Sequence, residues 1–337
     1  MNNRFIIITS INPPTDAIRS FASWLGWTTV VVGDRKSPRD WHHENVVYLS
    51  VEDQINLAPD FAKFLPENTY TRKMMGYLFA FRHGAEAIFE SDDDNIPYPN
   101  AVDVVNRDLT LGLPVESVLA SQTGWVNVYK AFGALEAWPR GFPLHKLAVS
   151  SEQFMISEGG LPWGVMQYLA DEDPDVDSIY RMTNGKTVYF SREKRISIAQ
   201  NSFSPFNSQA TLWTPAAYPL MFLPLGVHDR ITDILRGYIA LSCLWKNEMT
   251  LGFASPIVFQ VRNFHNLLND FEQEIDLYLH GESWCKGLLG ISGGGMAQSF
   301  SEALRMLIGN SVLPSQNIAA YSEFLKYIST ECSPKTG

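Results

Sequence analysis

Residues 84–99, GAEAIFESDDDNIPYP, are the stretch of sequence that decides the fold and the candidate site. The apolar run at 85–89 predicts a buried strand, and this strand ends in an acidic cluster that includes Asp92, Asp93 and Asp94. In open α/β sheets, ligands bind beyond the carboxyl ends of the strands, so we expect these carboxylates to face a crevice. The alternative is a solvated acidic turn closed by two prolines.

The acidic triplet also has the chemistry of a metal site. Asp92 and Asp94 are separated by one residue, and carboxylate oxygens are hard ligands that suit a divalent cation such as Mg²⁺ or Mn²⁺. Such a cation neutralises a diphosphate. The sequence therefore favours a site for a phosphorylated ligand at the end of this strand.

The composition is that of a folded globular protein with one or two domains. The chain has 337 residues, of which 45% are hydrophobic and 18% are charged. Its net charge of -10 opposes nonspecific binding to nucleic acid, because no Lys/Arg block is present to replace phosphate counterions. A small anionic ligand would need local help from arginine, lysine or a metal.

Cysteine usage and hydropathy indicate a soluble, cytoplasmic protein. The three cysteines are odd in number and far apart, so they indicate neither a disulfide framework nor a zinc site. No signal peptide is recognisable, and the longest apolar stretch, 216–227, contains two prolines and is too short for a membrane span.

The first hundred residues alternate between predicted strands and helices. Strands are expected at 4–10, 27–32 and 46–49. Helices are expected at 14–26 and at 71–83, and a short helix is expected to follow a capping box formed by Ser50 and Asp53. This alternation predicts an α/β fold with a mostly parallel sheet, right-handed crossovers and loops gathered at one edge.

The pattern is less regular after residue 99. Residues 125–144 predict irregular segments, and a polar loop is expected at 201–214. We expect a strand at 187–190 and helices at 227–245, 296–308 and 318–328.

Two further segments carry groups that suit a nucleotide. Residues 33–38, GDRKSP, follow a predicted strand, so Asp34 is placed to accept hydrogen bonds from a base or ribose, with Arg35 and Lys36 toward phosphate. Arg72 and Lys73 begin a predicted helix, whose free N–H groups favour a diphosphate. A surface turn and a solvated first helical turn are the respective alternatives.

Six sequence blocks in one order resemble a known family. They are VVVGDRKSP (30–38), YTRKMMGYLFAFRHGA (70–85), ESDDDN (90–95), WPRGFPL (138–144), DPDVDSIYR (173–181) and RITDILRGYI (230–239). Together they resemble the STELLO-like glycosyltransferases, which are similar in turn to the reversibly glycosylated polypeptides, the plant UDP-arabinopyranose mutases. The resemblance extends from about residue 6 to about residue 279.

The resemblance implies a GT-A-like nucleotide-sugar-binding fold with a mostly parallel mixed central sheet. Residues 1–280 would form this domain, with a nucleotide-sugar-binding half at 1–100 and an acceptor half at 101–280. Residues 281–337 would form a helical C-terminal extension. The first half would then supply the donor site.

The resemblance also assigns the donor site. The acidic triplet would be the DXD motif, in which Asp92 and Asp94 hold Mn²⁺ or Mg²⁺ against the diphosphate, with Asp93 nearby. Further donor-binding residues implied in this way are Thr9 and Asp34 at the nucleoside, Arg72 and Lys73 near ribose or phosphate, and Arg140 in the pocket wall. The loop residue Arg35 is included among them.

Fewer residues are assigned to the acceptor side of the site. Asp233 corresponds by resemblance to an acidic position that faces the sugar or the acceptor hydroxyl, where it would be the general base of an inverting reaction. The alternative is a helix aspartate paired with Arg236 or Arg230. Asp175 is a second candidate for the acceptor carboxylate or a metal ligand. His265 is the candidate for a third metal ligand.

The predicted function is metal-dependent transfer of a sugar from a UDP-sugar to an unidentified glycan, protein or small-molecule acceptor. Nucleic acid and a membrane span are not expected, and a homo-oligomer is left open. One alternative is a nucleotide-sugar mutase that shares the donor site. The other is a catalytically silent scaffold for polysaccharide synthesis.

Overall fold

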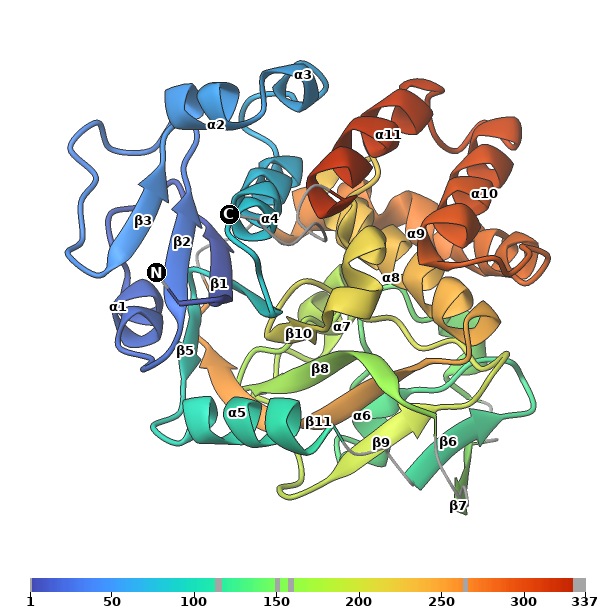
Figure 1. The fold of residues 1–337 in the computed structure, drawn as a ribbon. Helices are drawn as coiled ribbons and strands as arrows, with labels where there is room; N and C mark the ends of the chain where they lie inside the picture. The colour runs from blue at the N-terminus through green and yellow to red at the C-terminus, as the bar shows by residue number, and fades with distance from the viewer. Residues whose placement is uncertain (1, 113–116, 149–151, 157–160, 263–265, 330–337) are drawn as a thin grey trace.

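A single mixed sheet forms the centre of the molecule. The computed structural model describes residues 2–112, 117–148, 152–156, 161–262 and 266–329. Within these residues the strands follow the order β3-β2-β1-β4-β10-β8-β11-β9-β6-β7, and β5 pairs with β11 (Figure 1). The sheet therefore joins segments from both halves of the chain.

The N-terminal half contributes a parallel block of four strands. These are β1 (Arg4–Thr9), β2 (Thr28–Val32), β3 (Val46–Leu49) and β4 (Ala87–Asp92), with β1 paired between β2 and β4. The side chains of β1 alternate between two buried clusters, because successive residues of a strand point to opposite faces. Both faces of this block are consequently buried.

Helices from the crossovers cover the two faces. Ile6 and Ile8 pack with α1 (Asp16–Ala22), whereas Phe5 and Ile7 pack in the cluster that contains the apolar residues of α4 (Lys73–Arg82). The short helix η1 (Tyr70–Arg72) leads into α4, and α2 (Val51–Leu57) and α3 (Pro59–Ala62) precede it. The predicted capping box at the start of α2 is present.

The second half extends the sheet with strands of both directions. The nine residues of β8 (Trp163–Asp171) are all buried, and β8 pairs in parallel with the eleven-residue β11 (Thr250–Gln260). Antiparallel β10 connects β4 to β8. The other strands are β5 (Asn95–Pro97), β6 (Ser117–Ser121), β7 (Glu152–Ile156), β9 (Arg195–Ile198) and β10 (Thr211–Trp213).

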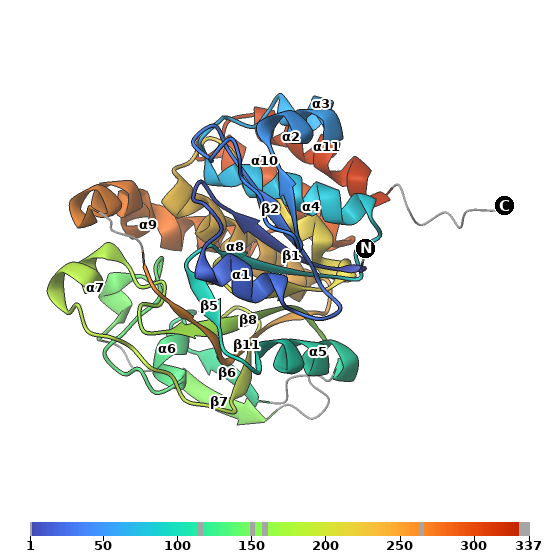
Figure 2. The ribbon, with the colours of Figure 1, turned by 90° about the vertical axis from the view of Figure 1, so that its left-hand side faces the viewer.

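Four long helices follow in the C-terminal part of the chain. They are α8 (Asp229–Lys246), α9 (Leu267–Leu288), α10 (Met296–Gly309) and α11 (Gln316–Ser329). Helix α11 contacts α4, and α10 contacts α8, so these helices lie on the side of the molecule away from β6 and β7 (Figures 1 and 2). The shorter elements are α5 (Ala101–Leu111), α6 (Val128–Ala131), α7 (Ser178–Thr183), η2 (Leu144–Lys146) and η3 (Pro215–Met221).

The α/β class, the mixed sheet and the C-terminal helices are confirmed, with three differences in detail. Strand β4 continues through Glu90 and Ser91 to Asp92, because buried partners accommodate these polar side chains. The strand expected at 187–190 is wrong: Val188 makes an isolated bridge to Glu172. Strands β8 and β11 and helices α5 and α9 were not predicted from the sequence.

The predicted division of the chain at residue 280 stays a prediction. Helix α9 runs across this position.

Among the described residues, no helix combines the length and apolarity that crossing a membrane requires.

A buried ion pair joins α8 to β4. Glu90 and Arg236 both have fully buried side chains, and Arg236 Nη2 lies 2.7 Å from Glu90 Oε1. The same oxygen accepts a 2.8 Å hydrogen bond from Trp213 Nε1, and Glu90 Oε2 accepts one from Tyr77. The pair therefore ties together α4, α8, β4 and β10 in the core.

Removing the cation from this pair is expected to be costly. Arg236→Met leaves the Glu90 charge buried and uncompensated, which we expect to lower the free energy of unfolding by about 3–5 kcal/mol. Urea denaturation measures the loss. The double variant Glu90→Gln/Arg236→Met should regain part of this stability.

An exposed arginine provides the matched control. Arg19 pairs with Asp16 at 2.9 Å, and both side chains are mostly exposed. Arg19→Met should change the free energy of unfolding by no more than about 0.5 kcal/mol. An equal effect of Arg19→Met and Arg236→Met would contradict the structural role of the buried pair.

Candidate active site

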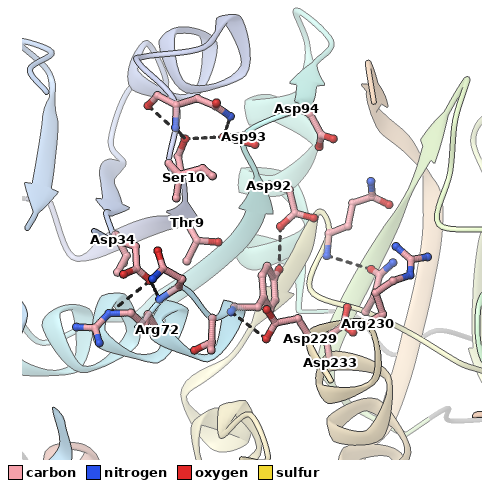
Figure 3. A pocket seen from close by; sticks show the side chains of 18 of the residues that line it. Thr9, Ser10, Asp34, Arg72, Asp92, Asp93, Asp94, Asp229, Arg230 and Asp233 are labelled. Carbon is pink, nitrogen blue, oxygen red and sulfur yellow. Dashed lines mark hydrogen bonds and ion pairs between the residues drawn. The ribbon is translucent and has the colours of Figure 1, made fainter. Parts of the chain in front are cut away.

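A cavity of about 660 Å³ opens at the carboxyl ends of the parallel strands. Thr9 ends β1, Asp34 follows β2, and Asp92 ends β4, and all three line this cavity (Figure 3). Parallel strands end at a common edge of a sheet, so residues far apart in sequence meet there. The predicted crevice next to the acidic triplet is thus present.

The three aspartates of the triplet do not play equivalent parts. Asp93 accepts hydrogen bonds from Ser10 Oγ at 2.5 Å and Asn12 Nδ2 at 2.9 Å. Its side chain turns toward Ser10, whereas the carboxylates of Asp92 and Asp94 lie on the other side of the strand end (Figure 3). Asp93 therefore anchors the loop after β1, and the other two carboxylates remain available to a ligand.

Asp94 and Asp92 have different electrostatic surroundings. Burial, aided by the charge of Asp92, raises the pKa of Asp94 to about 7, although Gln260 Nε2 donates a 2.9 Å hydrogen bond to it. Asp92 accepts hydrogen bonds from the Tyr70 hydroxyl at 2.8 Å and from Lys73 Nζ at 3.1 Å. The wall that these two carboxylates form would be stabilised by an added cation.

These residues fit a divalent metal in part. Mg²⁺ is commonly held by one or two carboxylates, together with substrate phosphates and water, and Asp92 and Asp94 supply that number. Within the described residues, no group of three or more His, Cys, Asp or Glu side chains converges on a point. His265, the candidate third ligand, lies outside the described residues, so its assignment stays a prediction.

Asp34 and Arg72 form the opposite end of the cavity. Asp34 Oδ2 accepts a 2.7 Å hydrogen bond from the backbone N–H of Asn68 and lies 3.9 Å from Arg72 Nε. Arg72 Nε donates to Gln54 Oε1 at 2.8 Å, and burial lowers the pKa of Arg72. The cavity thus places a carboxylate and a guanidinium side by side, away from the triplet.

Two cations predicted to bind the ligand are positioned elsewhere. Lys73 is fully buried below the cavity, where Nζ donates to the carbonyl oxygens of Ser91 at 2.7 Å and Ser208 at 3.1 Å as well as to Asp92. Arg35 is largely exposed and pairs with Glu67 at 2.9 Å, outside the cavity lining. Neither side chain lines the cavity, because each is paired with protein groups, and their assignment to the donor stays a prediction.

A buried arginine holds the two aspartates predicted for the acceptor side. Arg140 Nε and Nη2 donate to the carboxylate of Asp175 at 2.9 and 2.7 Å, and Nη1 and Nη2 donate to Asp233 at 3.1 Å each. Burial opposes charge on Asp175, but Arg140 more than offsets it and holds the pKa of Asp175 below its usual range. Arg140 also donates to the backbone carbonyl of Arg230. The alternative partners suggested for Asp233, Arg230 and Arg236, instead pair with Glu274 and Glu90.

The structure adds lining residues that the sequence analysis did not identify. Among them are Tyr70, Asn207, Gln209, Asp229, Gln260 and Arg262. Tyr70 joins three segments, since its hydroxyl contacts Asp92 and Ser208 while its backbone N–H donates to Asp229. A usable signal existed only for Gln260 and Arg262, which stand at the end of a long apolar run like the one before Asp92.

Comparisons with known proteins were made for sequence and structure. The chain is 28% identical over 307 residues to the probable glycosyltransferase STELLO2 of Arabidopsis thaliana, covering 85% of this chain and 39% of that relative. It is 28% identical over 264 residues to the probable glycosyltransferase STELLO1 of the same plant, covering 72% and 33%. The chain thus spans less than half the length of these relatives. No protein-family model matches.

Among solved structures, glucosyl-3-phosphoglycerate synthase of Mycobacterium tuberculosis, in complex with Mn²⁺, UDP and glucosyl-3-phosphoglycerate, aligns with a TM-score of 0.42. The identity is 10%, and the alignment covers 84% of this chain and 79% of that chain.

The relatives agree with the blocks quoted from the sequence. Both matches extend over most of this chain at the same level of identity. The resemblance of the chain to the STELLO-like glycosyltransferases is therefore confirmed.

Proposed function

We propose that this chain is a metal-dependent glycosyltransferase of GT-A-like type that transfers a sugar from a UDP-sugar to an acceptor hydroxyl. The observation that supports this most strongly is the cavity that Asp92 and Asp94 line together with Thr9, Asp34 and Arg72. The two curated relatives carry the name of probable glycosyltransferases. Sequence similarity and the arrangement of the cavity thus support the same activity.

In the proposed donor complex, each end of the cavity binds one part of the nucleotide. Asp34 and Arg72, which lie beside each other, would take the nucleoside, with Thr9 next to them at the end of β1. Asp92 and Asp94 would hold Mn²⁺ or Mg²⁺ at the diphosphate. The bound cation supplies charge stabilisation for the departing diphosphate.

The proposed reaction is a substitution at the anomeric carbon of the donor sugar. The acceptor oxygen forms a bond to this carbon, and the bond from the carbon to the diphosphate oxygen breaks. UDP leaves with the bonding electron pair, and the acceptor hydroxyl loses its proton to a base. The protein must therefore stabilise an anion at one end and accept a proton at the other.

We propose Asp233 as the proton acceptor, with Asp175 and Arg140 as residues that position it. Asp233 lines the cavity from the first turns of α8, and Arg140 holds both of its oxygens. The ion pair fixes this carboxylate in place. Asp175 in turn orients the guanidinium, since it occupies the other donor edge of Arg140.

The metal requirement can be tested by binding alone. Calorimetry should show UDP binding in the presence of Mn²⁺ and at least tenfold weaker binding after chelation of the metal, a loss of about 1.4 kcal/mol or more. Asp92→Asn and Asp94→Asn should each abolish the metal-dependent part, because each removes an anionic ligand.

The triplet contains its own control for this experiment. Asp93→Asn removes the same charge from the middle position, where the side chain accepts hydrogen bonds from Ser10 and Asn12. We expect its metal-dependent UDP binding to stay within about threefold of the original chain. Unchanged binding in Asp92→Asn and Asp94→Asn would contradict the proposed metal site.

The role of Asp233 predicts a separation of binding from turnover. Asp233→Asn should lower the rate of UDP release from the UDP-sugar that the unaltered chain consumes by about 100-fold or more, the usual contribution of a general base. The dissociation constant for UDP should remain within about twofold of its original value. A loss of rate smaller than tenfold would exclude Asp233 as the base. Asp229→Asn, which removes another cavity carboxylate, is the control.

Product analysis separates the transferase from the two alternatives. With UDP-arabinopyranose, we expect no UDP-arabinofuranose in chromatography of the reaction mixture. Formation of the furanose nucleotide without an added acceptor would favour the mutase. Intact metal-dependent UDP binding with no release of UDP from any UDP-sugar would favour a silent scaffold.

A further inference from the structure

A second cavity of about 410 Å³ adjoins the first at the end of β11. Gln260 and Arg262 line both cavities, so the two cavities share this part of their walls. The remaining wall comes mainly from residues 172–188, which include α7, and from the start of α9. No residue assigned to the proposed nucleotide site lines this second cavity.

Three arginines surround the boundary between the cavities. Arg230 lines the first cavity, Arg181 lines the second, and Arg262 lines both. Their side chains are only 14%, 8% and 12% exposed, respectively. Burial, together with the charges of Arg181 and Arg230, lowers the pKa of Arg262. The three guanidinium groups are thus close enough to act on one another in a poorly solvated place.

Three protein carboxylates pair with these three cations, but two guanidinium N–H groups are left without an acceptor among the described residues. Arg181 pairs with Asp173, and Arg230 pairs with Glu274. Asp270 is shared, because it lies 3.2 Å from Arg262 and 3.7 Å from Arg230. The Nε groups of Arg181 and Arg262 find no hydrogen-bond acceptor within the part of the chain that the structure describes. A buried N–H without an acceptor costs free energy, so these two guanidinium groups keep unused hydrogen-bonding capacity.

We propose that the second cavity binds an anionic group, a carboxylate or a phosphate, of the acceptor. This inference rests on the proposed transferase function, since it gives the chemical class of the acceptor for that reaction. The anion would lie between Arg181 and Arg262, with Lys186 at the exposed rim of the cavity. Glu172 and Asp173 also line this cavity and oppose the anion, so the arginine side is its place of binding.

The shared wall places the bound anion next to the first cavity. An acceptor held at Arg262 extends from the second cavity into the first, where Asp233 and Arg140 form part of the wall. The charged end would therefore fix the acceptor while its hydroxyl group reaches the donor sugar. Charge-assisted hydrogen bonds to arginine are well suited to such fixing.

The test compares three probes that share one sugar ring. D-glucose is neutral, D-glucuronate carries a carboxylate, and D-glucose 6-phosphate carries a phosphate. Their dissociation constants for the full chain are measured by saturation-transfer NMR, with UDP and Mg²⁺ present at saturation and again without them. We expect at least one anionic probe to bind about tenfold or more tightly than glucose. The tighter of the two identifies the acceptor as carboxylate-bearing or phosphate-bearing.

Variants assign this binding to the second cavity. Arg181→Gln and Arg262→Gln should each raise the dissociation constant of the anionic probe about tenfold and leave that of glucose unchanged. Lys186→Glu changes a side chain that is 67% exposed, so it is expected to fold, and should weaken the anionic probe at least about threefold. Arg19→Gln, on α1 and outside both cavities, should have no effect.

The inference is overturned if neither anionic probe binds more tightly than glucose, or if Lys186→Glu and the two arginine variants leave the anionic probe unaffected. Its failure is distinct from failure of the proposed function. Asp92→Asn and Asp94→Asn should lose metal-dependent UDP binding but retain the anionic probe. Conversely, loss of the probe in Arg181→Gln, whose side chain lines only the second cavity, should leave UDP binding within about twofold.

Discussion

The fold and the candidate site both depend on the carboxylates that strand β4 places inside the molecule. Strand β4 is apolar at Ile88 and Phe89 and then places Glu90 in the core and Asp92 at the cavity. An unpaired carboxylate in such a position would be prohibitively costly, so the fold provides a buried cation for each one. Arg236 of α8 neutralises Glu90, and Lys73 of α4 reaches Asp92.

This requirement connects the core to the candidate site. The cations arrive from helices that follow different strands, so α4 and α8 must pack against the same part of the sheet before Asp92 can be held in place. Tyr70 and Ser208 complete the surroundings of Asp92 through a shared hydrogen bond. Lys73 therefore stabilises the site through its hydrogen bond to Asp92, although it does not line the cavity.

The far wall of the cavity has the reverse arrangement of charges, with a buried cation paired with carboxylates. There a buried cation, Arg140, is surrounded by the carboxylates Asp175 and Asp233, and Asn207 adds a 2.6 Å hydrogen bond to Asp175. Next to it, Arg262 and Arg230 share Asp270. The first cavity thus has an acidic wall at the strand end of β4 and a region richer in arginine at the strand end of β11.

Local patterns in the sequence determined the α/β alternation of the first hundred residues, the capping box of α2, three of the four long C-terminal helices (α8, α10 and α11) and the presence of acidic groups at a strand end. These features depend on periodicity and on residues close together in the chain. Asp34 and the triplet could therefore be assigned to one cavity in advance, because parallel strands end at a common edge, whereas Thr9 and Arg72 were placed with them by the family resemblance. Only the tertiary structure decided that Asp93 is hydrogen-bonded to Ser10 and Asn12, that Lys73 is buried and Arg35 exposed, and that Arg140 joins Asp175 to Asp233. Those outcomes depend on contacts such as that between residues 140 and 233, whose distance along the chain leaves no local pattern to read.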